Sequence, residues 1–174
     1  MSTALLWFRN DLRLTDNLAL QAALEQFDTI LPVYVFDEQW LIQDQYGFDR
    51  TGPFRLQFLL ESLQDLKSHL NELGSDLLIR RGKPEQIIPA LMEEFDCAQV
   101  YASKEYTDEE LKVERALEKK VHLTIVHNST LIHPDDVVFD IERMPEVFTA
   151  FRKKVERYSR VRDAVPSPSS IASP

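Results

Sequence analysis

The stretch ALLWFRNDLRLTDN, residues 4–17, sets the pattern on which the rest of the chain is built. Its first five residues are apolar, which predicts a strand over residues 4–8 that is buried on both faces. Arginine and aspartate then alternate where the strand should pass into a helix, which we expect to be capped by Asp16 and to run to about Phe27. The alternating charges indicate either a ligand site or ion pairs that hold this turn.

The same order, a short apolar run followed by a helical pattern, recurs along the chain. The further strand-like runs are residues 30–36, 76–80, 98–103 and 122–127. Pro32 cannot donate a ladder hydrogen bond, so we expect the second strand to begin just after it. Strands that alternate with helices predict an α/β fold, a Rossmann-like doubly wound sheet of five parallel strands in the order 3-2-1-4-5 with helices on both faces.

Three helical patterns between the later strands carry apolar stripes that belong to the core. The longest follows residues 52–53, has leucines at steps of three and four, and should stop at Gly74. Pro84 occupies a first-turn position of the next helix. Thr107 and Glu110 have the spacing of a capping box, which predicts that a fourth helix starts there.

The chain divides into three predicted parts. Residues 1–135 should form the α/β domain, residues 136–162 a connecting segment with a basic helix, and residues 163–174 a linker or tail rich in proline and serine. A five-stranded domain should not need the last helix and the tail for its own core. We therefore expect that more protein once followed Pro174.

The net charge of −9 is unevenly distributed. Residues 143–162 contain seven basic and two acidic side chains, so this segment carries +5 and the rest carries −14. DNA phosphate repels an acidic body, which disfavours non-specific nucleic-acid binding by this chain alone. The basic segment is either a solvated helix face or a contact for phosphate or an acidic partner.

Several classes of protein are disfavoured by what the sequence lacks. No apolar run approaches the roughly 20 residues of a membrane span, and the first ten residues do not resemble a signal peptide. Cys97 is the only cysteine, which excludes an internal disulfide or a thiolate metal cluster and indicates a buried thiol. A cytoplasmic location without membrane contact fits best.

The glycine pattern and the known nucleophile motifs are equally informative. The four glycines form neither GxGxxG nor a P-loop, which disfavours a nicotinamide, FAD or ATP site in this domain. HExxH and GxSxG motifs are absent, and the four histidines are scattered along the sequence. We therefore expect neither a catalytic residue nor a metal site in this chain.

Ligands of open parallel sheets bind beyond the carboxyl ends of the strands, at the point where the strand order reverses. In the predicted order this crevice lies between the first and fourth strands. Two polar clusters should therefore face each other across it, and their members are Arg9, Asn10 and Asp11 on one side and Lys104, Glu105 and Tyr106 on the other.

Glu105 is the sharpest ligand candidate in this crevice. Its carboxylate could accept a pair of hydrogen bonds from the N–H groups of an amino-heterocycle, and a ring of this kind could stack on Tyr106 or Trp40. The alternative is that Lys104 and Glu105 only form an edge that caps the next helix.

Several motifs, in register along nearly the whole chain, resemble the photolyase/cryptochrome family. WFRNDLRLTDNLAL is similar to the family's amino-terminal pattern WFR-x-DLR-x-x-DN-x-AL. PVYVFD, LLIRRGKP and YASKEYTDEELKVERAL follow in the family's order, and TGPFRLQFLLES and FTAFRKKVE look most like its cryptochrome DASH branch. The resemblance covers Ala4 to about Arg162.

This resemblance implies the antenna half of a two-part machine. Family members combine an α/β domain with a large helical domain that binds FAD and damaged DNA, and they split pyrimidine dimers or sense blue light. An antenna pigment, in this branch usually methenyltetrahydrofolate, lies in the cleft between the two domains. Residues 1–174 do not contain the helical domain, so the resemblance implies a chain without repair activity and empty of both cofactors, whose partner is that domain.

The resemblance also assigns roles to individual residues. Glu105 corresponds to the carboxylate that hydrogen-bonds the pterin ring of the folate. Members with other antennas use residues at the end of the first strand, which here are Trp7, Phe8, Arg9 and Asn10. The polar positions of the motif are Arg9, Asp11, Arg13, Asp16 and Asn17. For these positions the resemblance implies ion pairs, a helix cap at Asp16 and contacts to the helical domain.

Two other functions remain open on the sequence. The chain could be a stand-alone α/β interaction or regulatory module that binds a partner, or itself, through the apolar side of EVFTAFRKKVE. It could also bind a small nucleotide, which the missing glycine loop disfavours. A tight, specific oligomer would favour the first, and binding of ATP or AMP would favour the second.

Overall fold

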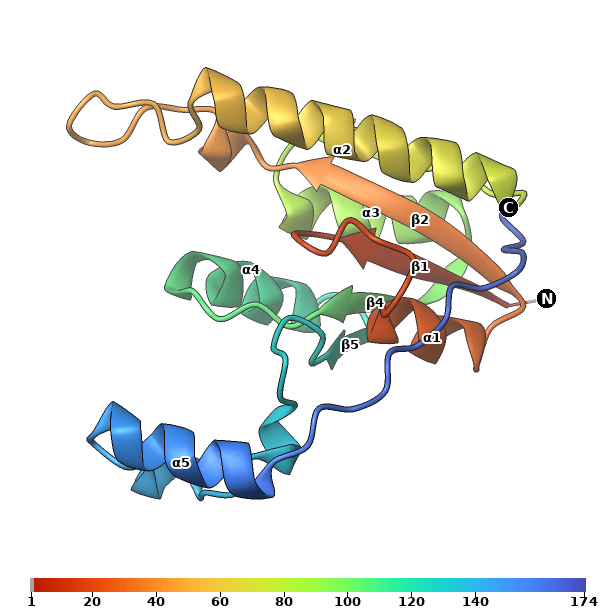
Figure 1. The fold of residues 1–174 in the computed structure, drawn as a ribbon. Coiled ribbons are helices and arrows are strands. Elements are labelled where there is room, and N and C mark those ends of the chain that lie inside the picture. Colours follow the sequence, from red (N-terminus) through yellow and green to blue (C-terminus); the bar gives the residue numbers. More distant parts are fainter. Residues whose placement is uncertain (1) are drawn as a thin grey trace.

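A sheet of five parallel strands forms the centre of the protein (Figure 1). The structure is a computed structural model that describes residues 2–174, with only the backbone of Ile141; Met1, the first residue of the predicted 1–135 domain, lies outside the described residues. The strands are β1 (Thr3–Phe8), β2 (Thr29–Phe36), β3 (Leu78–Arg81), β4 (Cys97–Ser103) and β5 (Leu123–Val126).

The strands lie in the order β3-β2-β1-β4-β5, and every adjacent pair is parallel. The predicted α/β fold and strand order are therefore confirmed. The order reverses at β1, which β2 and β4 flank, so the carboxyl ends of β1 and β4 border the predicted crevice.

Helices cover both faces of the sheet. These are α1 (Leu18–Leu24), α2 (Pro53–Glu72), α3 (Pro84–Glu94) and α4 (Asp108–Glu118). A further helix, α5 (Phe148–Tyr158), lies apart from the sheet (Figure 1), and single 3₁₀ turns lie at η1 (Glu38–Trp40), η2 (Pro134–Asp136) and η3 (Ile141–Arg143). Apolar residues of α1 and α2 pack on one face, and those of α3 and α4 pack on the other. Among the described residues, no helix has the length and apolar character that crossing a membrane requires.

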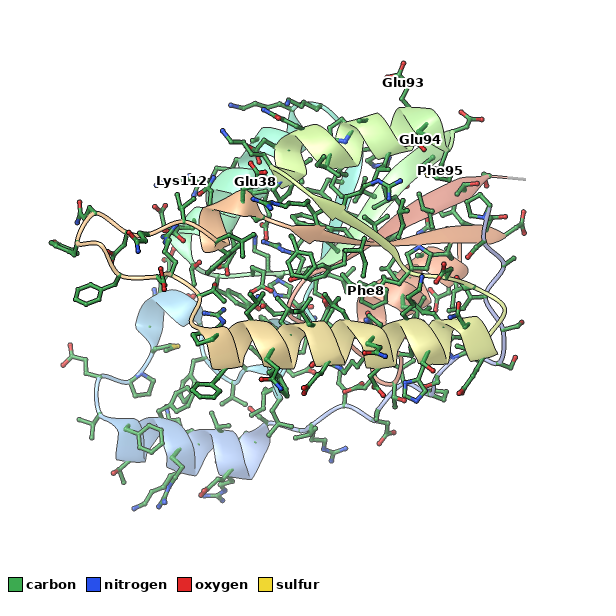
Figure 2. All side chains as sticks on the ribbon, turned by 90° about the horizontal axis from the view of Figure 1, so that it is seen from above. Phe8, Glu38, Glu93, Glu94, Phe95 and Lys112 are labelled. Atoms are coloured by element: carbon green, nitrogen blue, oxygen red, sulfur yellow. The ribbon has the colours of Figure 1, made fainter. Side chains whose placement is uncertain are left out.

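The central strand β1 contributes to both layers of the core, because successive side chains of a strand point to opposite faces. Leu6 and Phe8 pack with Leu66 of α2 in one cluster. Leu5 and Trp7 pack in the other cluster, which the side chains of α3 and α4 complete. Figure 2 shows Phe8 on the side of the sheet that α2 covers. The continuous apolar run at the start of the chain thus becomes a strand buried on both sides.

The predicted helix signals are confirmed where they are local. Gly74 follows α2 with a φ of +84°, a left-handed conformation that favours glycine and ends the helix. Pro84 is the first residue of α3. Thr107 and Glu110 form a capping box at the start of α4, in which each side chain bonds the other residue's backbone.

Pro32 lies inside β2, so the expectation that the strand begins after it is wrong. It is paired with Leu6 of β1. The Phe36 carbonyl accepts from Gly82 on the β3 side, and alternation along the strand turns the backbone of Pro32 to that same side. β3 begins only opposite Val33, so the N–H that Pro32 lacks has no strand to bond. The proline therefore costs the sheet no hydrogen bond.

Asp16 does not cap α1, which corrects a second expectation. The cap is Asn17, whose Oδ1 accepts a hydrogen bond from the Leu20 amide at 3.0 Å. Asp16 has a φ of +52° and forms the left-handed turn one residue earlier. Its carboxylate accepts instead from the amide of Val165 in the tail, at 3.2 Å. The helix is also shorter than predicted and ends at Leu24.

The tail is part of the core, although the last helix is not. No residue of α5 is buried, and Figure 1 shows α5 apart from the sheet. From α5 the chain runs past α1 to the far end of α2, where Ile171 is only 2% exposed within the α1/α2 cluster. The Ile171 amide bonds the Leu73 carbonyl, and the Ile30 amide bonds the Ala172 carbonyl, both at 2.9 Å. The expectation that the core does without residues 163–174 is therefore wrong, whereas the predicted domain boundaries stay a prediction.

Candidate functional site

The carboxyl ends of β1 and β4 bring the two predicted polar clusters together. Asn10 donates a hydrogen bond from Nδ2 to Glu105 Oε1 at 2.9 Å. Arg9 donates from Nη1 to the carbonyl of Ser103, the residue before Lys104, at 3.3 Å. The expected facing of the clusters is confirmed by these contacts, while their role in ligand binding stays a prediction.

A buried glutamate that sequence reasoning missed joins the two clusters. Glu114 of α4 is 2% exposed, and its Oε1 accepts from Arg9 Nη1 at 2.6 Å and from the Glu105 amide at 3.3 Å. Its Oε2 accepts from Lys104 Nζ at 2.5 Å. Burial acts to raise the pKa of the Glu114 carboxyl, but the hydrogen bonds and charges of Lys104 and Arg9 outweigh it and lower the pKa. The group is therefore a carboxylate held between two cations.

Glu105 is partly buried at the rim of this cluster. Burial raises the pKa of its carboxyl above the usual value, and the Asn10 hydrogen bond and the Arg9 charge oppose that rise. A carboxylate has about four acceptor positions, of which Asn10 uses one. A carboxylate that is partly withdrawn from water and not fully bonded is a strong acceptor for N–H groups of a ligand.

Asp11 links the ends of three strands rather than facing a ligand. It is 6% exposed, and its Oδ1 accepts from the Arg9 amide at 3.0 Å. Its Oδ2 accepts from the Ser103 hydroxyl at the end of β4 and from Asn128 Nδ2, just after β5, at 3.4 Å. A buried carboxylate requires donors of this kind. The geometry supports the structural role that the resemblance implies for Asp11.

Arg13 and Asn17 extend the same structural network. Arg13 Nη2 donates to the Asp16 carbonyl at 3.0 Å and to the Asn128 carbonyl at 2.9 Å. Asn17 Nδ2 donates to the Arg13 carbonyl at 2.9 Å while its Oδ1 caps α1. The polar motif after β1 therefore ties together the first turn, α1 and the segment that follows β5.

A cavity of about 270 Å³ lies next to this network. Side chains from the ends of β1 and β2, from η1, from the first half of α2 and from the start of α4 form its wall. The sequence-predicted residues that line it are Trp7, Phe8, Arg9, Asn10 and Trp40, whereas Lys104, Glu105 and Tyr106 do not. Asn10 belongs to the cavity wall and bonds Glu105, so it connects the cavity with the glutamate.

Tyr106 and Trp40, the two predicted stacking residues, lie in different surroundings. Tyr106 is 50% exposed, and its hydroxyl lies 2.9 Å from Nδ1 of His127. Trp40 lines the cavity, with the Arg55 guanidinium 5.4 Å from its ring centre. A ligand ring could therefore stack on Trp40 inside the cavity or lie beside Tyr106 at the Glu105 edge.

The cavity wall combines aromatic rings with charged side chains of both signs. Burial raises the pKa of the Tyr34 hydroxyl to about 12, against the lowering effect of Arg55, so this hydroxyl is a hydrogen-bond donor at neutral pH. Burial also raises the pKa of Asp37 above its usual value. Arg9 and Arg55 lie in the same wall as Asp37, Glu109 and Glu110, so the cavity can hold a flat aromatic molecule with polar groups at its edge.

Sequence signals existed for some of the residues that were missed. Phe54 and Phe58 form an aromatic pair at helical spacing beside the leucine stripe of α2, and Phe58 lines the cavity. Glu114 lies three residues before the buried Leu117, on the face of α4 that turns to the sheet. A glutamate inside an apolar stripe, close to two basic residues in the fold, indicates a buried ion pair.

Comparison with known proteins gives concordant results. Residues 4–169 match the family model described as DNA photolyase. A cryptochrome DASH from Gloeobacter violaceus is 45% identical over 97% of this chain and 35% of its own length. A cryptochrome DASH from Arabidopsis thaliana, named chloroplastic/mitochondrial, is 42% identical over 96% of this chain and 31% of its own length. The crystal structure of a Synechocystis sp. PCC6803 cryptochrome has a TM-score of 0.95 and 38% identity over 99% of this chain and 37% of its own. The chain thus spans about a third of the length of these relatives.

Proposed function

Because this chain belongs to the DNA photolyase family, we propose that it is the antenna-chromophore-binding domain of a photolyase or DASH-type cryptochrome. The observation that carries the proposal is the position of Glu105 at the carboxyl edge of the sheet, where Asn10 bonds its carboxylate and Glu114 accepts from its amide. Ligands of doubly wound sheets bind at this edge, beside the strand at which the order reverses.

The residues at this edge fit the pterin ring of methenyltetrahydrofolate. The ring carries N–H groups that a partly buried carboxylate accepts well, and Tyr106 provides an exposed aromatic side chain one residue away. When bound, such a pigment absorbs light and transfers the excitation energy. The chain's own part is to orient the ring through Glu105. This chain offers a single wall for a pigment that lies between two domains, so its own affinity should be low.

Further partners belong to the same proposal. FAD and damaged DNA would bind to a helical domain of the parent protein and not to this chain, in line with the acidic charge of the α/β body. Light-driven repair or light sensing would then be properties of the whole protein. A cytoplasmic location stays a prediction, since the name of the Arabidopsis relative assigns it to chloroplasts or mitochondria.

The test is a titration of the purified chain with methenyltetrahydrofolate, followed by pigment fluorescence and by ligand-observed NMR. The unsubstituted chain should bind weakly, and Glu105→Gln should weaken binding further because a neutral amide accepts N–H hydrogen bonds less well. Glu118→Gln, an exposed change on α4, is the matched control. Equal binding by the unsubstituted chain and Glu105→Gln would contradict the assignment of Glu105 as the acceptor for the pterin ring.

A second position for an antenna is the cavity, which its aromatic wall favours. Trp40→Ala should then abolish binding of a flavin-like pigment and leave the Glu105 edge intact. Titration of the unsubstituted chain and of this variant with riboflavin and FMN distinguishes the cavity from the Glu105 edge. Binding that survives Trp40→Ala would exclude stacking on Trp40.

The alternative to an antenna domain is an interaction module. Exposed aromatic side chains favour it, since Phe54 is 86% exposed, Tyr46 74% and Phe148 72%. Sedimentation of the purified chain distinguishes the two functions. A tight, specific oligomer would favour the module, whereas a monomer that binds pigment favours the antenna domain.

A further inference from the structure

A single buried carboxylate contacts three of the candidate antenna residues. Glu114 receives the Arg9 guanidinium and the Glu105 amide on Oε1 and the Lys104 ammonium on Oε2. The Arg9 and Glu114 side chains are 6% and 2% exposed, whereas Lys104 is 25% exposed. Buried charges require a partner of opposite charge, so removal of the Glu114 carboxylate would leave Arg9 and Lys104 without their shared counter-ion.

Glu105 is an alternative partner for these cations. It follows Lys104 in the chain, and the Arg9 charge already acts on its carboxyl. The other charged groups that act on it, Glu110 and Asp11, are acidic and cannot pair with it. With Glu114 in place, the side chain of Glu105 bonds the neutral amide of Asn10 instead of a cation.

We propose that Glu114 is the positioning residue of the candidate antenna site: it takes up Arg9 and Lys104, fixes the backbone of Glu105, and so leaves the Glu105 carboxylate available to the N–H groups of a pigment. The inference rests on the proposed function of Glu105. Two effects combine, because a carboxylate that is paired with a guanidinium or ammonium group makes weaker bonds to a ligand and also points elsewhere.

Glu114→Gln tests this inference, because glutamine keeps the shape of the side chain and removes its charge. Circular dichroism and a cooperative unfolding curve confirm the fold of the variant. We expect its affinity for methenyltetrahydrofolate to fall about tenfold. We also expect the pKa of Glu105, followed by carboxyl-carbon NMR without any pigment, to fall by about one unit as the freed cations pair with it. Glu118→Gln should change neither value.

A second variant shows whether the freed cations cause the changes in Glu114→Gln. Adding Lys104→Gln to Glu114→Gln removes one of the two freed cations, so the pKa of Glu105 should rise again and part of the affinity should return. An unchanged Glu105 pKa in Glu114→Gln would overturn the inference, as would a lowered pKa with unchanged pigment affinity. If the unsubstituted chain binds no pigment, the proposed function fails. The pKa of Glu105 in Glu114→Gln then still decides whether Glu114 keeps the two cations away from Glu105.

Discussion

The Asp16 amide donates a 2.7 Å hydrogen bond to the carbonyl of Val165, and the Val165 amide donates back to the Asp16 carboxylate at 3.2 Å. This reciprocal pair joins the first turn of the chain to the tail, 149 residues later. The hydroxyls of Thr15 and Ser167 add a further contact at 2.6 Å. The tail is thereby aligned so that Ile171 enters the core.

Ile171→Ala should lower the free energy of unfolding by about 3 kcal/mol, because it removes a fully buried side chain and leaves a cavity in the α1/α2 layer. Urea unfolding followed by circular dichroism measures this loss. Val161→Ala, at a position that is 56% exposed, should change the free energy of unfolding by less than about 0.5 kcal/mol. A similar effect of both substitutions would show that the tail does not contribute to the core.

Asn17→Ala should destabilise the chain by about 1–2 kcal/mol, because it removes the cap of α1 and the bond to the Arg13 carbonyl. Asp16→Asn should cost less than about 0.5 kcal/mol, since asparagine adopts the left-handed conformation and keeps an oxygen for the Val165 amide. Thermal unfolding of the two variants side by side measures the difference. A larger destabilisation by Asp16→Asn than by Asn17→Ala would indicate that Asp16 is the cap of α1.

Glu114→Gln should flatten the acid dependence of stability. The pKa of Glu114 lies below its usual 4.5 in the folded chain, so the stabilisation is complete above pH 4.5 and is lost as the pH falls through the folded-state pKa. At neutral pH the substitution should cost about 2–3 kcal/mol, because it breaks a buried ion pair. Urea unfolding at several values between pH 3 and 7 tests both expectations, with Glu118→Gln as control. A parallel acid dependence in both variants would contradict this linkage.

Cys97 should be unreactive in the folded chain. Burial raises the pKa of its thiol to about 11, and the Asp96 charge adds to the rise. Two pKa units correspond to about a hundredfold less thiolate than in a free cysteine, so a disulfide reagent at pH 8 should label the native chain at least about a hundredfold more slowly than the urea-unfolded chain. Equal labelling rates would show that the thiol is accessible, contrary to the 8% exposure of this residue.

Much of the fold could be predicted because its signals are local. The run Ala4–Phe8, the leucines of α2 and the capping box of Thr107 each depend on residues within one or two turns of the chain. The alternation of strands and helices then leaves few topologies, and the order β3-β2-β1-β4-β5 is the simplest of them. The facing of Asn10 and Glu105 followed from this order alone.

The predictions that failed concern partners that lie far apart in the sequence. Asp16 and Asn17 are both good caps, and the choice between them depends on the bonds that Val165 makes with Asp16. Pro32 fits within β2 only because β3 starts one residue later. No local pattern contains this information.

By itself, the sequence determined the layered α/β architecture, its strand order and the edge at which the two polar clusters meet, since hydrophobic periodicity and strand–helix alternation fix these. Only the tertiary structure decided which polar groups are buried together. Glu114 meets Arg9 from 105 residues away, and Ile171 meets the core through a tail rich in proline and serine. Burial of a charge or of a single apolar side chain depends on what distant segments bring to it, and that becomes defined when the sheet assembles.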